Sequence, residues 1–89
     1  MPLTKLRKDI DQLDHDIVKL LKKRLKVVEK IAKVKKKQGI EIFDKTRENE
    51  IAKKLAKLAK KHKVKKALLY KIWDVIMEEA KDFQKKIKK

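Results

Sequence analysis

The sequence predicts an all-α fold of three helices, one long and two shorter. Turn formers are scarce, because the 89 residues include one glycine and one proline, whereas an all-β fold needs many turns. Leu, Ile, Val and Phe make up 27 of the 89 residues, well above the roughly 20% below which chains stay disordered. Apolar residues also recur in steps of three and four, which is the spacing of an amphipathic helix.

The first helix is predicted over residues 3–37, and its apolar stripe follows a heptad pattern. We name this stripe the seam, and it consists of Leu3, Leu6, Ile10, Leu13, Ile17, Leu20, Val27, Ile31 and Val34. Arg24 stands where the pattern expects the next apolar residue after Leu20. The helix should end before Gly39, because glycine readily adopts the left-handed backbone conformation of a helix stop.

A second helix is predicted over residues 45–61 and a third over residues 66–88. Asp44 can cap the second helix by accepting hydrogen bonds from free backbone N–H groups. The inward stripe of the second helix is Ile51, Leu55 and Leu58, with Ala52, Ala56 and Ala59 beside it. The inward residues of the third helix are Leu69, Ile72, Val75, Ile76, Ala80, Phe83 and Ile87.

The helix lengths predict an assembly of two chains. At about 1.5 Å per residue the three helices measure about 50, 25 and 33 Å, so neither shorter helix can cover the first one. A homodimer in which two long helices run antiparallel, with the shorter helices packed around them, would cover the seam along its whole length. We therefore expect one domain over residues 1–89 and an intertwined homodimer.

Composition excludes several classes of function. The formal net charge is +16, with 26 lysines and only three arginines. The chain has no cysteine and no serine, and His15 and His62 fall at expected surface positions, so neither a Ser–His or Cys–His nucleophile nor a metal site is expected. No apolar run approaches the roughly 20 residues that span a bilayer, and the start lacks the apolar core of a signal peptide, so we expect a cytoplasmic protein. The Lys-rich and Ile-rich composition resembles that of thermophile proteins, and an engineered sequence would share it.

The candidate site is a constellation of fixed charge. Arg24 and Lys35 fall within about 20° of one helix face and about 16 Å apart along the axis, which suits a small anion. Arg7 lies about 25 Å from Arg24, but it could approach Arg24 of a second, antiparallel chain. Glu48 faces inward in the first turn of the second helix, and Gln84 lies near the inward side of the third. Simpler readings stay open for three of them: Arg24 snorkelling to solvent, Glu48 acting as a cap, and Gln84 exposed near a helix end.

The ordered motifs resemble the all-helical class of chorismate mutase, whose intertwined dimers of three-helix chains rearrange chorismate to prephenate. The resembling stretches are residues 6–14, 20–24, 34–35, 44–48 and 78–84. They keep the family's spacing without gaps over nearly the whole chain. The resemblance implies the fold, the homodimer, chorismate as substrate, no cofactor, and a place in phenylalanine and tyrosine biosynthesis.

The resemblance also implies a role for each matching residue. Arg24, with Arg7 from the other subunit, would bind the two substrate carboxylates. Lys35 and Gln84 would hydrogen-bond the ether oxygen whose bond to carbon breaks, where negative charge develops in the transition state. Glu48, together with the backbone near residue 44, would receive the ring hydroxyl.

Three further positions complete the implied substrate-binding set. Asp44 would contribute that backbone contact, and Arg47 would add positive potential at the pocket edge. Ala80 departs from the family pattern, in which a serine or another polar residue often helps to hold a carboxylate. The departure affects one secondary contact and leaves the main set intact.

Three alternatives compete with this interpretation. Isochorismate–pyruvate lyase uses a similar pocket on the same fold to eliminate pyruvate. A non-enzymatic helical protein could bind nucleic acid through the basic surface, but the lysines are spread over all three helices without aromatic residues between them. A catalytically inactive or designed relative would keep the fold without the activity. The leading interpretation includes no nucleic acid and no membrane as partners.

Overall fold

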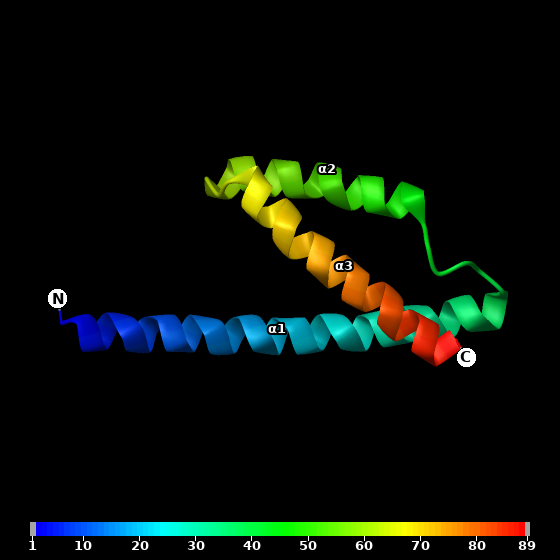
Figure 1. The fold of residues 1–89 in the computed structure, drawn as a ribbon, viewed down its shortest axis with the longest axis horizontal. Helices are drawn as coiled ribbons and strands as arrows, with labels where there is room; N and C mark the ends of the chain where they lie inside the picture. Colours follow the sequence, from blue (N-terminus) through cyan, green and yellow to red (C-terminus); the bar gives the residue numbers. More distant parts are fainter. Residues whose placement is uncertain (1, 89) are drawn as a thin grey trace.

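The computed structural model describes residues 2–88 and consists of α1 (Leu3–Gln38), α2 (Lys45–His62) and α3 (Lys66–Lys88) (Figure 1). No strand occurs among these residues, which confirms the predicted all-α fold of one long and two shorter helices. α1 and α2 each end one residue beyond the predicted end. The first and last residues of the predicted domain, 1 and 89, lie outside the described part.

Two helix ends fix the connector between α1 and α2. Gly39 adopts a φ of 67° in the left-handed region, and the next backbone N–H, of Ile40, donates to the Lys35 carbonyl at 2.9 Å. At the other end, Asp44 Oδ1 accepts the backbone N–H of Arg47 at 3.0 Å and caps α2. The connector is therefore anchored on both sides, which matters because it forms one wall of the site described below.

α3 joins the other two helices. It packs against both α1 and α2, whereas α1 and α2 do not pack on each other in the described chain. Figure 1 shows α3 crossing obliquely from the end of α2 to the second half of α1, with the C-terminus beside that half. The N-terminal end of α1 extends beyond both other helices (Figure 1).

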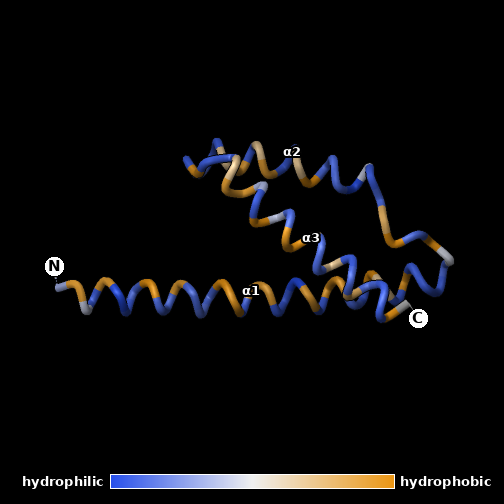
Figure 2. The backbone as a smooth tube through the Cα atoms, viewed as in Figure 1, coloured by the Kyte–Doolittle hydropathy of each residue, from blue (hydrophilic) through white to orange (hydrophobic). Residues whose placement is uncertain are grey.

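The small core of this single chain lies beside the seam on α1, and the seam is the face that the sequence assigns to a second chain. The buried apolar residues are Val28, Ala32, Leu55, Ala59 and Ala80. None of them belongs to the seam, whose side chains are 42–62% exposed in this chain. The part of α1 that packs inside the chain is the neighbouring stripe, and Figure 2 shows apolar residues recurring along the whole helix, including its projecting end. α1 therefore has two apolar stripes, of which the chain itself covers only one.

Three residues predicted to face inward are exposed instead: Leu58, Ile72 and Val75. α3 crosses α1 at an angle, so its first half diverges from α1, and Ile72 and Val75 line an open hollow of about 730 Å³ with Ile17 and Leu20 on the opposite wall. Leu58 is uncovered because, within residues 2–88, α3 is the one helix on which α2 packs. These corrections have one cause, which is that a single chain leaves its apolar faces half covered.

The overall dimensions agree with an incomplete core. The radius of gyration is 16.3 Å, whereas a compact domain of this length has about 12 Å. The accessible surface is 7869 Å², whereas a folded monomer of 10.6 kDa exposes about 5,500 Å². Among the described residues, no helix is both long enough and apolar enough to cross a membrane.

Candidate active site

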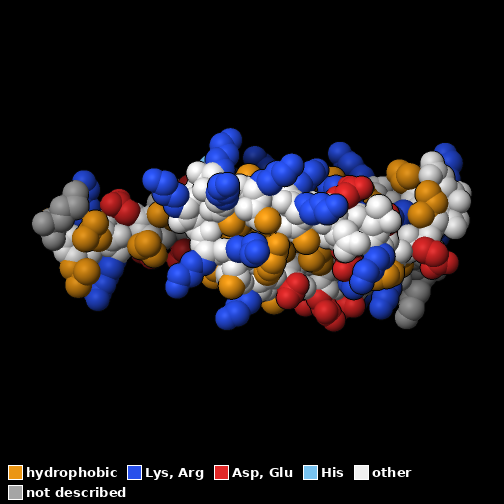
Figure 3. Space-filling view, turned by 90° about the horizontal axis from the view of Figure 1, so that it is seen from above, with side chains coloured by type: hydrophobic (Ala, Val, Ile, Leu, Met, Phe, Trp, Pro, Cys, Tyr) orange, Lys and Arg blue, Asp and Glu red, His pale blue; other side chains and the backbone are white. Residues whose placement is uncertain are grey.

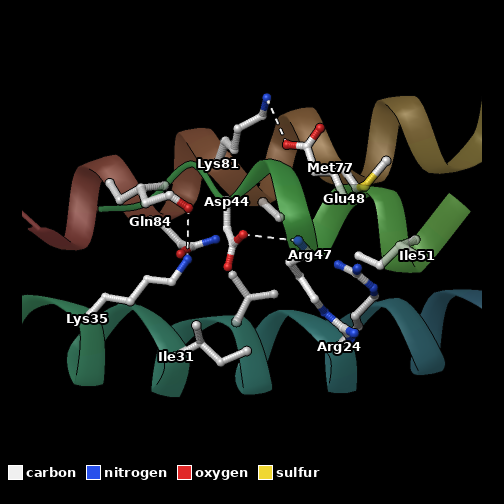
Figure 4. Close-up of a pocket in the computed structure, with 13 residues that line it drawn as sticks. Arg24, Ile31, Lys35, Asp44, Arg47, Glu48, Ile51, Met77, Lys81 and Gln84 are labelled. Atoms are coloured by element: carbon white, nitrogen blue, oxygen red, sulfur yellow. Dashed lines mark hydrogen bonds and ion pairs between the residues drawn. The ribbon is translucent and has the colours of Figure 1, made fainter. Parts of the chain in front are cut away.

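A pocket of about 340 Å³ lies where the three helices and the connector meet (Figure 4). This volume is within the range of about 300–1,000 Å³ typical of small-molecule sites. It is lined by Arg24, Val28, Ile31, Lys35, Ile42, Asp44, Arg47, Glu48, Ile51, Met77, Ala80, Lys81 and Gln84. The polar groups thus converge on one cavity whose remaining walls are aliphatic.

α1 supplies two cations from one face. Arg24 and Lys35 both line the pocket, as their spacing predicts, and both are half-buried. Lys35 Nζ donates to the Ile42 carbonyl at 2.8 Å, which ties α1 to the connector. The pKa of Arg24 is lowered, first by burial and second by the nearby positive charge of Arg47. An anion bound between the two guanidinium groups would raise the pKa of Arg24 again, because a nearby negative charge favours the charged form of an arginine.

α2 contributes its first turn. Asp44 and Arg47 line the pocket and are joined through the cap, while the Arg47 guanidinium also bonds Glu50 at 3.1 Å on the exposed side. Glu48 is half-buried, and its Oε2 lies 3.5 Å from Lys81 Nζ of α3. Glu48 also belongs to the first turn of α2, so its carboxylate lies at the positive end of the helix, where backbone N–H groups favour negative charge.

α3 adds a buried amide. Gln84 is only 8% exposed, and its Oε1 has no hydrogen-bond partner within the described chain. Buried polar atoms nearly always have partners, so an orphaned acceptor beside a cavity is consistent with a bound molecule or water completing it. Ala80, one turn earlier, is also buried and offers no polar group.

The structure brings seven of the eight predicted site residues to this pocket. The exception is Arg7, which is exposed on the first part of α1 and does not line the cavity. His15 and His62 are also exposed and lie outside it. In the described residues, no cluster of histidine and carboxylate side chains is arranged to hold a metal ion.

Sequence reasoning missed one charged residue of the pocket, Lys81. It stands three positions before Gln84, which places the two on one face of a helix, so the same spacing rule that linked Arg24 to Lys35 would have found it. It was hidden among 26 lysines, most of which belong to the surface. The aliphatic walls were missed as well: Ile31 was interpreted as a seam residue rather than as a neighbour of Arg24, and Val28 was not singled out.

Charge decides what this cavity can bind. Its wall carries four cations, Arg24, Lys35, Arg47 and Lys81, against two carboxylates. No serine, threonine, cysteine or histidine is among the lining residues, so the wall offers fixed charge and hydrogen bonds rather than a side-chain nucleophile. The fold and pocket define the class: an all-helical protein with a cationic cavity suited to a small anion.

Comparison with known proteins gives the family. The sequence profile described as "Chorismate mutase type II" matches residues 6–85. The chain is 36% identical over 83 residues to a protein named chorismate mutase from Methanocaldococcus jannaschii, covering 93% of this chain and 84% of that relative. The chain belongs to the type II chorismate mutase family, whose enzymes are isomerases.

Two other relatives are longer proteins. The chain is 37% identical over 83 residues to a bifunctional chorismate mutase/prephenate dehydratase of Buchnera aphidicola subsp. Acyrthosiphon pisum, covering 93% of this chain but 22% of the relative. A protein of the same name from Aquifex aeolicus is 40% identical over 58 residues, covering 65% of this chain and 16% of its own length. No solved structure gives a significant match.

Proposed function

We propose that this chain rearranges chorismate to prephenate in the pocket between its three helices. The observation that carries the proposal is the convergence of seven of the eight family-matched residues on one cationic cavity of about 340 Å³. The reaction is an isomerisation in which one C–O bond breaks and one C–C bond forms within a single molecule. It needs a folded substrate and stabilised charge, which this wall of fixed cations can supply.

The proposed roles are those that the family resemblance implies for the matching residues, and the positions of the side chains are compatible with them. Arg24 binds one substrate carboxylate, and Arg7 of the partner subunit binds the other. Lys35 and Gln84 donate to the ether oxygen as negative charge develops on it. Lys35 is suited to this role because its ammonium has three donors and, among the described residues, only one is used, on the Ile42 carbonyl.

The other end of the substrate would meet α2. Glu48, with the backbone near Asp44, accepts the ring hydroxyl, and Arg47 adds positive potential beside Arg24. Ala80 contributes shape without a polar contact. The product would enter phenylalanine and tyrosine biosynthesis, and we expect the enzyme to act in the cytoplasm with that pathway.

A homodimer is part of the proposal, because Arg7 is out of reach of its own pocket. The excess of about 2,400 Å² over the surface expected for a folded monomer corresponds to about 4,800 Å² for two chains, in the range of obligate homodimers. The exposed seam supplies the apolar face that a second copy would cover.

Charge favours the antiparallel arrangement of the two α1 helices. Residues 3–20 carry four basic and four acidic side chains, whereas residues 21–38 carry nine basic and one acidic. A parallel pair would set the two strongly basic halves side by side and repel. An antiparallel pair sets each basic half against the neutral, aspartate-bearing half of the partner.

The alternatives have less support. The family match does not favour a nucleic-acid-binding protein or a lyase. Figure 3 shows lysine and arginine side chains scattered over the displayed face with apolar patches between them, rather than gathered into one stripe. A basic stripe is the expected footprint of a protein that follows a phosphate backbone.

A direct assay tests the proposed function. The protein is incubated with chorismate and, separately, with isochorismate, and prephenate, salicylate and pyruvate are quantified. We expect prephenate from chorismate, inhibited by a bicyclic dicarboxylate that mimics the transition state. Pyruvate release from isochorismate without prephenate formation would favour the lyase, and no turnover of either compound would contradict an active enzyme.

A further inference from the structure

We propose that Lys81 is a positioning residue that holds the Glu48 carboxylate at the rim of the pocket. This inference rests on the proposed function and adds to it a residue outside the family-matched set. Lys81 lines the pocket from α3, and its Nζ lies 3.5 Å from Glu48 Oε2 of α2. Figure 4 shows the two side chains pointing toward each other, on the side of the pocket away from Arg24 and Lys35.

This ion pair differs from the others in the described chain. The pairs Lys33–Glu29 and Arg47–Glu50 each lie within one helix, and their side chains are 45–67% exposed. The Lys81–Glu48 pair joins two helices, and its side chains are 32% and 31% exposed. A pair that is partly shielded from solvent and spans two elements restricts both side chains more than a pair on an open helix surface.

A second contact fixes the position of Lys81. Its Nζ lies 4.9 Å from the centroid of the Phe43 ring, which belongs to the connector between α1 and α2. This distance is within the range of about 6 Å in which a cation is attracted to an aromatic face. Lys81 therefore contacts α2 and the connector from α3, so the ammonium is held from two directions.

The rotamer freedom of the Glu48 side chain explains why a positioning partner would matter. In the first turn of α2 its side chain has several rotamers, and some of them turn it toward solvent. Pairing with Lys81 selects one orientation at the pocket rim. A carboxylate has about four lone-pair sites, so the pairing still leaves acceptor capacity for the ring hydroxyl of the substrate.

The test measures kcat and KM for chorismate in Lys81→Met, which keeps the length of the side chain and removes the charge. We expect kcat to fall by about 3-fold to 5-fold, the upper part of the scale of a partly exposed ion pair converted to a rate. KM should change less than kcat, because substrate attraction is left to the three remaining cations. Lys81→Arg should recover most of the lost kcat, because a guanidinium can reach the same carboxylate.

The matched control is Lys85→Met, which removes an equal charge from an exposed position one turn later on α3. We expect near-normal kcat in this variant, and thermal melts of both variants should show folded protein. If Lys81→Met fails to fold, Lys81→Gln replaces it in the same comparison.

A double-mutant cycle with Glu48→Gln separates positioning from a merely structural role. If Lys81 acts through Glu48, Lys81→Met should change kcat less than about 2-fold in the Glu48→Gln background. Equal losses in both backgrounds, a rise in KM with unchanged kcat, or kcat equal to that of Lys85→Met would each overturn the inference alone. A wild-type chain without mutase activity would overturn the proposed function and this inference together.

Discussion

The two halves of α1 share one helical periodicity and have opposite surroundings. In the second half, Val28 and Ala32 are 6% and 1% exposed because α3 covers them, and Arg24 and Lys35 reach the pocket. In the first half, every large apolar side chain is at least 42% exposed, and Arg7 does not line the pocket that holds Arg24. The same pattern of residues thus builds a site in one half and leaves an uncovered surface in the other.

In the proposed dimer, each half of α1 would have its own partner. The second half packs against α3 within the chain, which holds its charged side chains in place. Its net charge is strongly positive. The first half is electrically neutral and keeps its apolar face open. A second copy of the chain would satisfy the apolar face and bring Arg7 to a pocket, so the two halves would complete each other across a dimer.

The largest expected effect comes from the second half. Arg24→Ala should lower kcat/KM by at least about 10²-fold, because removing one preorganised group that stabilises negative charge in the transition state typically costs that much. Steady-state kinetics with chorismate would measure it, with thermal unfolding to verify the fold. Lys26→Ala, an exposed position of the same half, is the control and should retain nearly full activity. Activity near normal in a folded Arg24→Ala protein would remove Arg24 from the proposed site.

The next prediction brings the two halves together. Arg7→Ala and Arg24→Ala chains should each be nearly inactive, whereas an equal mixture allowed to exchange subunits should recover about a quarter of the wild-type activity. After random exchange, half of all dimers in the mixture are heterodimers. In each heterodimer, one of the two shared sites keeps both arginines. Native mass spectrometry would establish heterodimer formation. Heterodimers without recovered activity would mean that the site is not shared.

Sequence reasoning succeeded where local chemistry decides the outcome. Gly39 and Asp44 fixed two helix ends, and the spacing of Arg24 and Lys35 correctly placed them on one wall of a pocket. Local periodicity did not decide which apolar residues of α1 pack inside the single chain. Val27 and Val28 are adjacent apolar residues, and periodicity alone does not say which of them faces α3 and which faces outward.

The same limit explains the exposed residues of the other helices. Ile72 and Val75 have the spacing of an inward face, but the crossing direction of α3 leaves them over a hollow rather than a core. A crossing angle depends on side chains of two helices distant in sequence, and a single periodic pattern does not contain it. The spacing of Lys81 and Gln84 places Lys81 near the pocket, but its contacts with Glu48 and Phe43 involve other elements and are not contained in that spacing.

A charged residue in the first half would test whether its apolar face is covered in solution. Ile17→Lys should reduce the free energy of unfolding by about 3 kcal/mol or more and weaken the dimer, because an unpaired charge would be buried at the interface. Urea unfolding and light scattering after size-exclusion chromatography would measure the two effects. His15→Lys adds a similar charge two residues away, on the opposite face of the helix, and should leave both quantities close to wild type. Equal behaviour of the two variants would indicate that the seam faces water.

The smallest expected effect compares two neighbouring valines in the second half. Val28 is 6% exposed in the chain, whereas Val27, a seam residue, is 54% exposed. Truncating a buried valine to alanine removes about 1–2 kcal/mol of stability. In a lone chain Val28→Ala should therefore cost far more than Val27→Ala, but in the dimer both should cost similar amounts, because the partner buries Val27. Alanine favours a helix over valine equally at both positions, so that gain cancels in the difference between the variants. Urea unfolding of the two variants at one protein concentration would give this difference, and a Val28→Ala cost about 1 kcal/mol or more above that of Val27→Ala would leave the seam uncovered.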